Sequence, residues 1–232
     1  MGEPIHLRPT ADLAPRVLLP GDPGRALQLA QSLTQRPLMF NHHRGLWGYT
    51  GIAADGEPLT IQATGMGGPS AAIVVHELAD LGAERVIRVG TCGSLRADLR
   101  LGALVVATEA LCGDGTSRAL GAGDRVGPDL GLLAALRAAA PGAAHGPVVS
   151  TDVFYGGELD APAEALAVEM EAATVFQVAA TRGLAAGCVL AVTDELAGGA
   201  RERMGAEAVE AAGEAVGRAG AAALGAVAPS AA

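Results

Sequence analysis

The sequence predicts a layered α/β domain, and two observations support this fold class. Short apolar runs rich in Val, Ile and Leu alternate along the chain with longer segments that have helical periodicity, a pattern typical of helices packed on a sheet. At 232 residues the chain is long enough for one large domain with a sizeable core. No linker, repeat or change of composition interrupts it, so we expect a single domain over residues 1–232.

The expected elements follow from the period of the apolar residues and from turn signals. The expected strands are RVLLP (16–20), YTGIAA (49–54), PLTIQAT (58–64), RVIRVGT (85–91), ALVVATEAL (103–111), GPVVST (146–151) and GCVLAVTD (187–194). The expected helices are 23–34, 69–82, 129–140, 171–182 and about 202–225. The turn signal ADGEP predicts that 49–54 and 58–64 form a hairpin.

The charged residues exclude several classes of function. A net charge of −9 argues against non-specific nucleic-acid binding, which needs a basic face. All 16 positive side chains are Arg and none is Lys, which excludes Schiff-base chemistry and the phosphate-binding P-loop. Any anion must therefore be held by Arg side chains and backbone N–H groups.

Cysteine usage and hydropathy indicate the cellular compartment. Cys92, Cys112 and Cys188 are widely spaced and form no CxxC motif, so we expect neither a disulfide framework nor a metal site. The sequence has no apolar run typical of a signal peptide or a membrane span. We therefore expect a soluble, cytoplasmic protein.

Four expected strands end in turns rich in glycine or polar residues, namely LPGDPGRA (19–26), ATGMGGPSA (63–71), RVGTCGSL (88–95) and VTDELAGG (192–199). Ligands of α/β sheets collect where strands end and helices begin. Glycine lets the backbone approach a ligand closely, and helix N-termini favour anions. Each turn alone is commonly structural, but four of them together predict a binding site.

Two arginines are candidates for binding an anion in these turns. Arg88 lies inside an apolar strand, where a cation needs an anionic partner, whereas Arg25 at a helix start is either solvated or turned inward. The guanidinium group suits bidentate contact with phosphate oxygens. Thr91 and the backbone N–H groups of the GTCG turn would complete a small anion nest.

Two glutamates, Glu169 and Glu171, lie in the otherwise apolar run ALAVEMEAATVFQVAA (165–180). Residues two apart share one face of a strand but point to nearly opposite sides of a helix. Two carboxylates with one purpose therefore predict that a strand ends here and a helix begins near Glu171. Their partners are either the vicinal hydroxyls of a sugar or an Arg in a buried ion pair.

Two further features are candidates for ligand contact. Phe154 and Tyr155 are adjacent in a chain with only 3% aromatic residues, and they would either stack on a flat base or pack in the core. Asp194 ends an apolar strand, where a partly buried acid can donate a proton or simply cap a turn.

Six motifs resemble, in order and spacing, those of the purine and uridine nucleoside phosphorylases. They are VLLPGDPGRA, HRGLWGYTG, TGMGGPSAAIVVHEL, RVIRVGTCGSL, VFY and VEMEAATVF, and the resemblance runs from about His6 to Asp194. It looks closest to the bacterial hexameric purine nucleoside phosphorylases. It implies a three-layer α/β/α domain with a central mixed, partly barrel-like sheet, assembled as a homohexamer of three dimers.

The resemblance also implies a role for each matching residue. Phosphate would be bound by Gly21, Arg25, Arg88, Gly90, Thr91 and, from the neighbouring subunit, Arg44. The nucleoside would be bound by Met66, Tyr155, Glu169, Met170, Glu171, Thr193 and, across the dimer interface, His6. Asp194 would protonate N7 of the purine with help from Arg201 or Arg203. No cofactor is implied, because inorganic phosphate is a co-substrate.

Three alternatives remain at this point. Uridine phosphorylases resemble this chain, but they read uracil with a Gln and an Arg after the aromatic pair, and GGELDAPAEAL (156–166) offers neither. Nucleosidases use water in place of phosphate and lack the arginines matched here by Arg25, Arg44 and Arg88. Some relatives only store or sense ligands. Preference between 6-oxo and 6-amino purines stays open.

Overall fold

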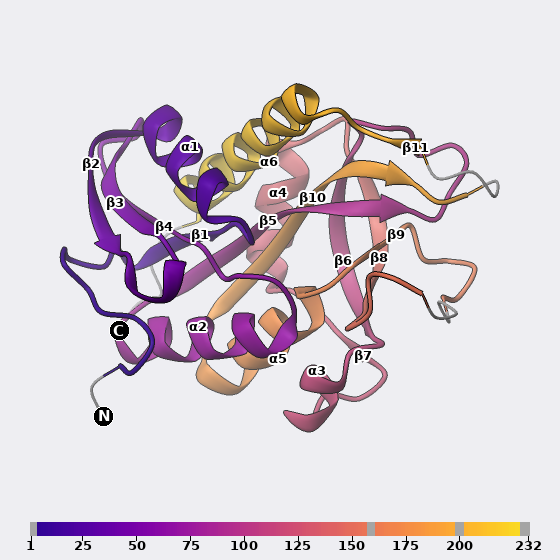
Figure 1. Ribbon diagram of the computed structural model, residues 1–232, viewed down its shortest axis with the longest axis horizontal. Helices are drawn as coiled ribbons and strands as arrows, with labels where there is room; N and C mark the ends of the chain where they lie inside the picture. Colours follow the sequence, from indigo (N-terminus) through magenta and orange to yellow (C-terminus); the bar gives the residue numbers. More distant parts are fainter. Residues whose placement is uncertain (1–3, 157–160, 198–201, 228–232) are drawn as a thin grey trace.

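A mixed β-sheet lies between two layers of helices in the computed structural model, which describes residues 4–156, 161–197 and 202–227 (Figure 1). The strands are β1 (Arg16–Leu19), β2 (Thr34–Asn41), β3 (Gly48–Ala53), β4 (Pro58–Gln62), β5 (Arg85–Ser94), β6 (Leu104–Cys112), β7 (Arg125–Val126), β8 (Ala144–Ser150), β9 (Ala167–Glu169), β10 (Ala185–Glu195) and β11 (Glu202–Arg203). The helices are α1 (Pro23–Leu33), α2 (Gly68–Asp80), α3 (Gly115–Ala119), α4 (Leu130–Ala139), α5 (Ala172–Arg182) and α6 (Ala206–Ala226), with a short 3₁₀ turn η1 (His43–Gly45).

Part of the sheet closes into a barrel. The strand order is β11-β10-β6-β8-β9-β5-β1-β4-β3-β2, and β10 pairs with β5 as well as with β6. The extra pairing joins β10, β6, β8, β9 and β5 into a ring, while β1, β4, β3 and β2 extend from β5 as an open sheet. Both parallel and antiparallel pairs occur, so the predicted three-layer fold with a mixed, partly barrel-like sheet is confirmed.

Each face of the sheet has its own hydrophobic core. One cluster joins α2 and α5 to the sheet through side chains such as Val75, Leu78 and Phe176. The other joins α1, α4 and α6 through Leu29, Leu136 and Val216. In Figure 1, α1 and α6 lie toward the top of the view, α4 lies behind β5 and β10, and α2 and α5 lie at the bottom. Burial on both faces explains why the central strands read as continuous apolar runs.

The expected strands and helices are all present, with ends shifted by a few residues. β3 and β4 form the predicted antiparallel hairpin, with Thr50 opposite Thr60. β9 ends at Glu169 and α5 begins at Ala172, with Glu171 at its N-cap. The predicted change from strand to helix near Glu171 is therefore confirmed.

The sequence did not indicate β2, because Pro37 and several polar residues interrupt its pattern. β2 is the last strand of the open edge, where a proline costs no ladder hydrogen bond. The pairing with β3 shifts register between Gln35 and Leu38, and Arg36 between them has a φ of 49°. A bulged, proline-containing edge strand resists pairing with other chains.

The prediction of a helix from about residue 202 is wrong at its start. Glu202 and Arg203 form β11, which pairs antiparallel with β10, and α6 begins only at Ala206. Gly205 separates the two elements as the N-cap of the helix. The short strand places Arg203 opposite Asp194 in the pairing. No helix in the described part of the chain is long and apolar enough to cross a membrane.

Candidate active site

One cavity of about 670 Å³ lies where the glycine-rich turns meet. The turns after β1 and β4 contribute Gly21 and Met66, β5 contributes Arg88, and β10 contributes Asp194. All four turns that the sequence predicts as parts of one site therefore meet at the same cavity. The predicted residues that line it are Gly21, Arg25, Arg44, Met66, Arg88, Gly90, Thr91, Glu169, Met170, Glu171, Thr193 and Asp194.

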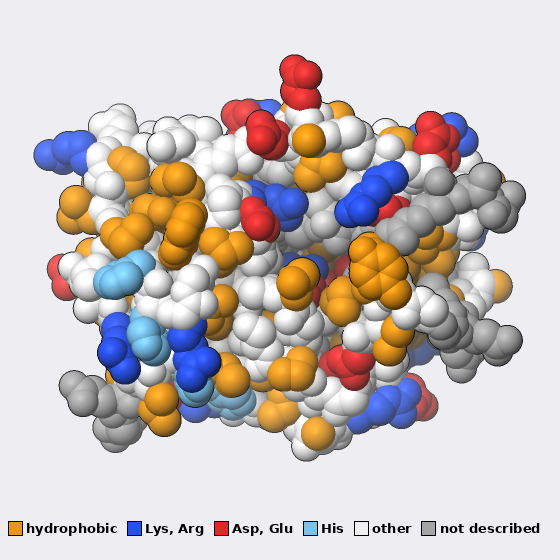
Figure 2. All heavy atoms as spheres, in the orientation of Figure 1, with side chains coloured by type: hydrophobic (Ala, Val, Ile, Leu, Met, Phe, Trp, Pro, Cys, Tyr) orange, Lys and Arg blue, Asp and Glu red, His pale blue; other side chains and the backbone are white. Residues whose placement is uncertain are grey.

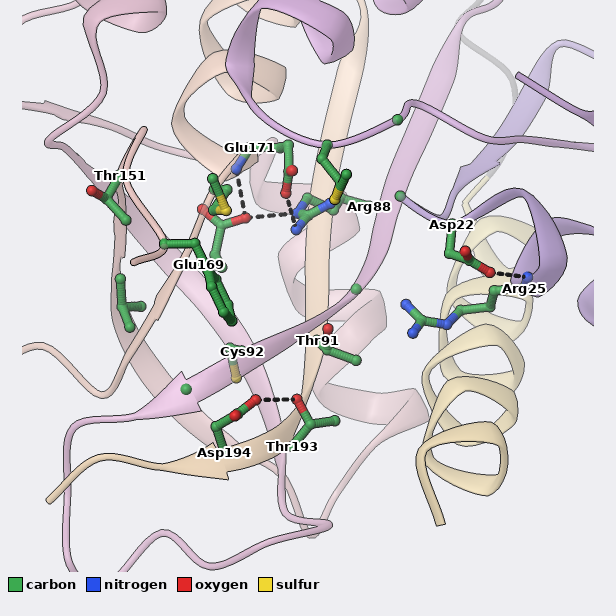
Figure 3. Close-up of a pocket in the computed structure, with 18 of the residues that line it drawn as sticks. Asp22, Arg25, Arg88, Thr91, Cys92, Thr151, Glu169, Glu171, Thr193 and Asp194 are labelled. Atoms are coloured by element: carbon green, nitrogen blue, oxygen red, sulfur yellow. Dashed lines mark hydrogen bonds and ion pairs between the residues drawn. The ribbon is translucent and has the colours of Figure 1, made fainter. Parts of the chain in front are cut away.

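Arg88 connects the two glutamates at the centre of the site (Figure 3). Its Nε donates to Glu169 Oε2 at 2.8 Å, and its Nη2 forms an ion pair with Glu171 Oε2. The side chains of all three are at least nine-tenths buried. Gly90 makes room for the arginine, because a Cβ there would lie 2.9 Å from Arg88 Nη2. Of the two kinds of partner considered for the glutamates, the structure contains the buried ion pair.

Glu169 also holds the start of α5 in place. Its carboxylate accepts hydrogen bonds from the backbone N–H groups of Glu171 at 2.9 Å and Ala172 at 2.9 Å, and from the Ser150 hydroxyl. Without Glu169, the two backbone N–H groups at the start of α5 would have no partner inside the helix. One carboxylate therefore caps a helix and orients Arg88.

The pKa values in this cluster follow from burial and charge. Burial opposes the charged form of Arg88, but the carboxylates of Glu171 and Glu169 outweigh it and raise the pKa of the guanidinium. For Glu171, burial raises the pKa although Arg88 lowers it. Glu171 also accepts a hydrogen bond from the Gly67 N–H at 2.5 Å, which fixes its other oxygen.

Arg25 reaches the cavity from the first turn of α1. Asp22 caps this helix by accepting a hydrogen bond from the Arg25 backbone N–H at 2.7 Å, and Pro23 suits the first helical position. The Arg25 guanidinium lies beside α6 in Figure 3, apart from the cluster of Arg88, Glu169 and Glu171. Burial lowers the pKa of Arg25, Asp22 opposes this, and the positive charge of Arg88 lowers it further. An anion between the two guanidinium groups would relieve their repulsion.

Asp194 lies across the cavity from Arg25 (Figure 3) and its side chain is 9% exposed. Its Oδ2 accepts a hydrogen bond from the Thr193 hydroxyl at 3.1 Å, and Arg203 Nε lies 3.5 Å from its Oδ1. The pairing of β10 with β5 shifts register between Val192 and Asp194, so Thr193 is an extra residue in the strand. Such a bulge re-aims the side chains beside it.

The remaining predicted residues lie outside the cavity lining. His6 is in the N-terminal segment, where its Nδ1 lies 2.7 Å from Glu77 Oε1. Tyr155 is 82% exposed, and its neighbour Phe154 lines the cavity instead. Arg203 reaches Asp194 from β11. Arg201 falls outside the described residues.

Phe154, one of the two aromatic candidates, lines the cavity. Sequence reasoning missed several other lining residues, namely Asp22, Pro23, Gly45, Leu46, Gly65, Cys92, Gly93, Thr151, Val153, Gly156, Val168 and Leu196. Most are direct neighbours of predicted residues. Leu196 is an exception, because only the fold shows that it packs over Gly93, where a Cβ would lie 2.8 Å from Leu196 Cδ1. Among the described residues no group of three His, Cys, Asp or Glu side chains is placed to hold a metal ion.

Comparison with known proteins decides the family. Residues 15–228 match the family model described as "Phosphorylase superfamily". The chain belongs to the phosphorylase superfamily. The resemblance that the six motifs carry is thereby confirmed.

Named relatives within the phosphorylase superfamily cover most of the chain. Guanosine phosphorylase from Halorubrum lacusprofundi is 38% identical over 208 residues, which are 85% of each chain. A DeoD-type purine nucleoside phosphorylase from Jannaschia sp. is 38% identical over 197 residues, 80% of this chain and 84% of the relative. The solved structure of uridine phosphorylase from Vibrio fischeri has a TM-score of 0.80 at 26% identity, over 92% of this chain and 91% of that one. These relatives are nucleoside phosphorylases, and both purine and uridine enzymes are among them.

Proposed function

We propose that this chain catalyses the phosphorolysis of purine ribonucleosides and deoxyribonucleosides to a free purine and ribose 1-phosphate or deoxyribose 1-phosphate. One observation carries the proposal. A single cavity is lined by two arginines, the buried Arg88 and the partly buried Arg25, and by an acid, Asp194, which lies apart from both in Figure 3. Relatives named for guanosine and purine nucleosides support the choice of substrate. We propose no cofactor beyond the co-substrate phosphate.

Phosphate would bind on the arginine side of the cavity. Among the described residues none accepts a hydrogen bond from the Arg25 guanidinium, although burial already disfavours its charge. Arg88 is held rigidly by Glu169 and Glu171, so its remaining donors are pre-oriented at no further entropic cost. Thr91 and the backbone at Gly21 and Gly90 would supply further hydrogen bonds to the anion.

The ribose would lie between phosphate and base, next to Glu171, Met66 and Met170. Each carboxylate oxygen has two lone pairs, so Glu171 can keep its contacts with Arg88 and Gly67 and still accept from the 2′- and 3′-hydroxyls. The ion pair found for Glu171 and the sugar contact proposed for it are therefore compatible.

The chemistry would use Asp194 as a general acid. A phosphate oxygen attacks C1′ as the C1′–N9 bond breaks, and the bonding electron pair moves to the purine. A protonated Asp194 transfers its proton to N7 and becomes a carboxylate. Arg203, 3.5 Å from Oδ1, would stabilise the carboxylate that this transfer leaves. Of the two candidate arginines, Arg203 is the one that the described residues include, and it lies beside Asp194.

Uridine is the second candidate substrate, because a uridine phosphorylase shares the fold at a TM-score of 0.80. The test is incubation of the purified protein with inosine, guanosine, adenosine and uridine, each with and without inorganic phosphate. We expect purine release only with phosphate, together with ribose 1-phosphate. Faster cleavage of uridine would assign a uridine phosphorylase, and equal rates without phosphate, giving free ribose, would assign a nucleosidase.

A pair of variants connects this result to the cavity. Arg25→Ala removes a guanidinium from the proposed phosphate site, whereas Arg218→Ala removes one from the exposed side of α6, where it pairs with Glu214. We expect a large rise in the KM for phosphate in Arg25→Ala and none in Arg218→Ala. Equal behaviour of the two variants would refute the phosphate site.

A further inference from the structure

Arg25 lies against helix α6 at a glycine. A Cβ on Gly213 would lie 2.9 Å from Arg25 Nε, 3.2 Å from its Cδ and 3.6 Å from its Cγ. The side chain of Arg25 therefore crosses the helix where α6 has no side chain of its own. Figure 3 shows the result, with the guanidinium beside α6 on the Thr91 side of α1.

Arg25 also borders a second cavity of about 300 Å³, on whose lining Asp22, Gln28, Val209 and Glu210 lie. Within the described chain no acceptor fixes the guanidinium in the main cavity, and the positive charge of Arg88 repels it. Asp22 borders both cavities, whereas the carboxylate of Glu210 borders only the smaller one and would attract the guanidinium there. The direction of the guanidinium therefore depends on how the Arg25 side chain packs against α6.

We propose that Gly213 is a positioning residue for phosphate binding, because its missing side chain lets Arg25 lie flat on α6 and face the main cavity. A side chain at this position would displace the Arg25 stem and turn the guanidinium toward Asp22 and Glu210. This inference rests on the proposed function, in which Arg25 binds phosphate.

The substitution Gly213→Ala tests it. The atoms that a new Cβ meets belong to a flexible side chain, so Arg25 and not the backbone moves. We expect the KM for phosphate to rise about tenfold, the scale of a lost charge-assisted hydrogen bond. The KM for the nucleoside and kcat at saturating phosphate should change little. The melting temperature should not fall, because Ala favours a helix interior over Gly.

Gly217→Ala is the matched control one turn further along α6. Its Cβ would overlap Leu29, a fully buried side chain on α1 that does not line either cavity. We expect this variant to lose thermal stability through overpacking while its KM for phosphate stays at the wild-type value. The two substitutions thus move stability and phosphate binding in opposite ways, which a general weakening of α6 would not do.

A double variant establishes that Gly213 acts through Arg25. In the Arg25→Ala background the added Gly213→Ala should leave the KM for phosphate unchanged, because the side chain it displaces is gone. An unchanged phosphate KM in Gly213→Ala alone, or additive effects in the double variant, would overturn the inference.

The failure of the proposed function gives a different result. Two results would refute the proposed role of Arg25 without any Gly213 variant. They are an equal rate of base release by the wild type without phosphate, and an unchanged KM for phosphate in Arg25→Ala. Stabilisation of each variant by inorganic phosphate, followed as a shift in melting temperature, provides a readout without any nucleoside. Gly213→Ala should weaken that shift and Gly217→Ala should keep it.

Discussion

Asp194 is the residue on which the proposed preference for purine nucleosides depends, and its proposed role as a proton donor can be tested directly. Asp194→Asn keeps the shape of the side chain but cannot transfer a proton. Because general acid catalysis contributes about 10²–10⁴-fold to rate, natural purine nucleosides should react slower by roughly that factor. 7-Methylguanosine already carries the positive charge that protonation supplies, so its phosphorolysis should be nearly insensitive. Steady-state rates for both substrates measure the contrast.

The two substrates control for folding, because a misfolded Asp194→Asn variant would lose both activities. Equal slowing of both in a folded variant would mean that Asp194 positions the base and does not protonate it. If neither reaction slows, the acid is another residue.

Glu77 on α2 organises the N-terminal segment. Its carboxylate accepts hydrogen bonds from the backbone N–H groups of Ile5, His6 and Leu7 at 2.6–3.1 Å and contacts His6 Nδ1. Glu77→Gln places an amide N–H₂ among these donors. We expect a loss of about 1–3 kcal/mol in the free energy of unfolding at pH 7. Hydrogen exchange of the three amides should accelerate, which measures the release of the segment.

The pH dependence of this variant has a definite sign. Burial alone would raise the pKa of Glu77, but the hydrogen bonds from Leu7, His6 and Ile5 lower it below its usual 4.5. A carboxyl with a lowered folded pKa contributes stability above its usual pKa and loses it as the pH falls through the folded value. Wild type and Glu77→Gln should therefore differ most above about pH 5 and converge in acid. Parallel stability curves down to pH 3 would contradict this role.

At the scale of elements, the junction of β9 and α5 depends on the pair formed by Glu169 and Arg88. Glu169→Ala removes one of the two carboxylates that pair with the buried guanidinium of Arg88 and also removes the helix cap. Breaking a buried pair in this way costs about 3–5 kcal/mol. Urea unfolding should show this loss. Replacing both residues by Met should restore little of it, because the buried carboxylate of Glu171 then loses Arg88 as its partner.

An exposed ion pair is the control for this experiment. Glu164→Ala removes one of the two carboxylate partners of Arg125 at the surface, where the contact is 2.7 Å but both side chains are solvated. Its unfolding curve should match that of the wild type. A comparable loss in Glu164→Ala and Glu169→Ala would mean that burial does not determine the cost.

The junction of β9 and α5 is an example of a feature that the sequence predicts well. Charged residues inside apolar runs need partners, so the positions of Arg88, Glu169 and Asp194 in the sequence are enough to indicate a site. The strands that carry them are continuous apolar runs, which also makes these elements easy to recognise. The sequence therefore predicts the site best where a charged residue in a buried strand needs a partner of opposite charge.

Other features depend on packing that no local pattern records. β2 is hard to recognise in the sequence because it contains Pro37, which an edge strand tolerates. The sequence predicts β11 as part of a helix, because only its pairing with β10, a long-range contact, makes it a strand. Of the adjacent aromatics, the backbone turns Phe154 and not Tyr155 into the cavity. Gly213 is one of many small residues in α6, and only the path of Arg25 singles it out.

At the scale of the whole molecule, exposed hydrophobic side chains gather beside the N-terminal segment. Ile5, Leu38, Met39 and Trp47 are each at least 39% exposed. The segments that carry them are joined by hydrogen bonds from Thr10 Oγ1 to Met39 O at 2.7 Å and from Asn41 Nδ2 to Leu46 O at 2.5 Å. Figure 2 shows apolar side chains over β2, β3 and β4, with His and Arg next to them. An apolar patch with a polar rim is typical of a protein interface.

A second copy of the chain on this patch would bring His6 and Arg44 to a neighbouring cavity, as the family resemblance implies. The structure places Arg44 at the edge of its own cavity, on a turn with a φ of 58°. Arg44 therefore acts either within its chain or across an interface, and a complementation experiment separates the two. We expect action across the interface, with a homo-oligomer, at least a dimer, measurable by light scattering.

The experiment mixes Arg44→Ala subunits with Arg88→Ala subunits after reversible dissociation. If Arg44 acts across a two-fold interface, each mixed dimer has one site with both arginines intact and one site that lacks both. Random mixing in equal amounts makes about half of the dimers mixed, so about a quarter of the wild-type activity should return. Mixing Arg44→Ala subunits with one another controls for the treatment. If Arg44 acts within its own chain, no site in the mixture has both arginines, and activity stays at the level of the parents.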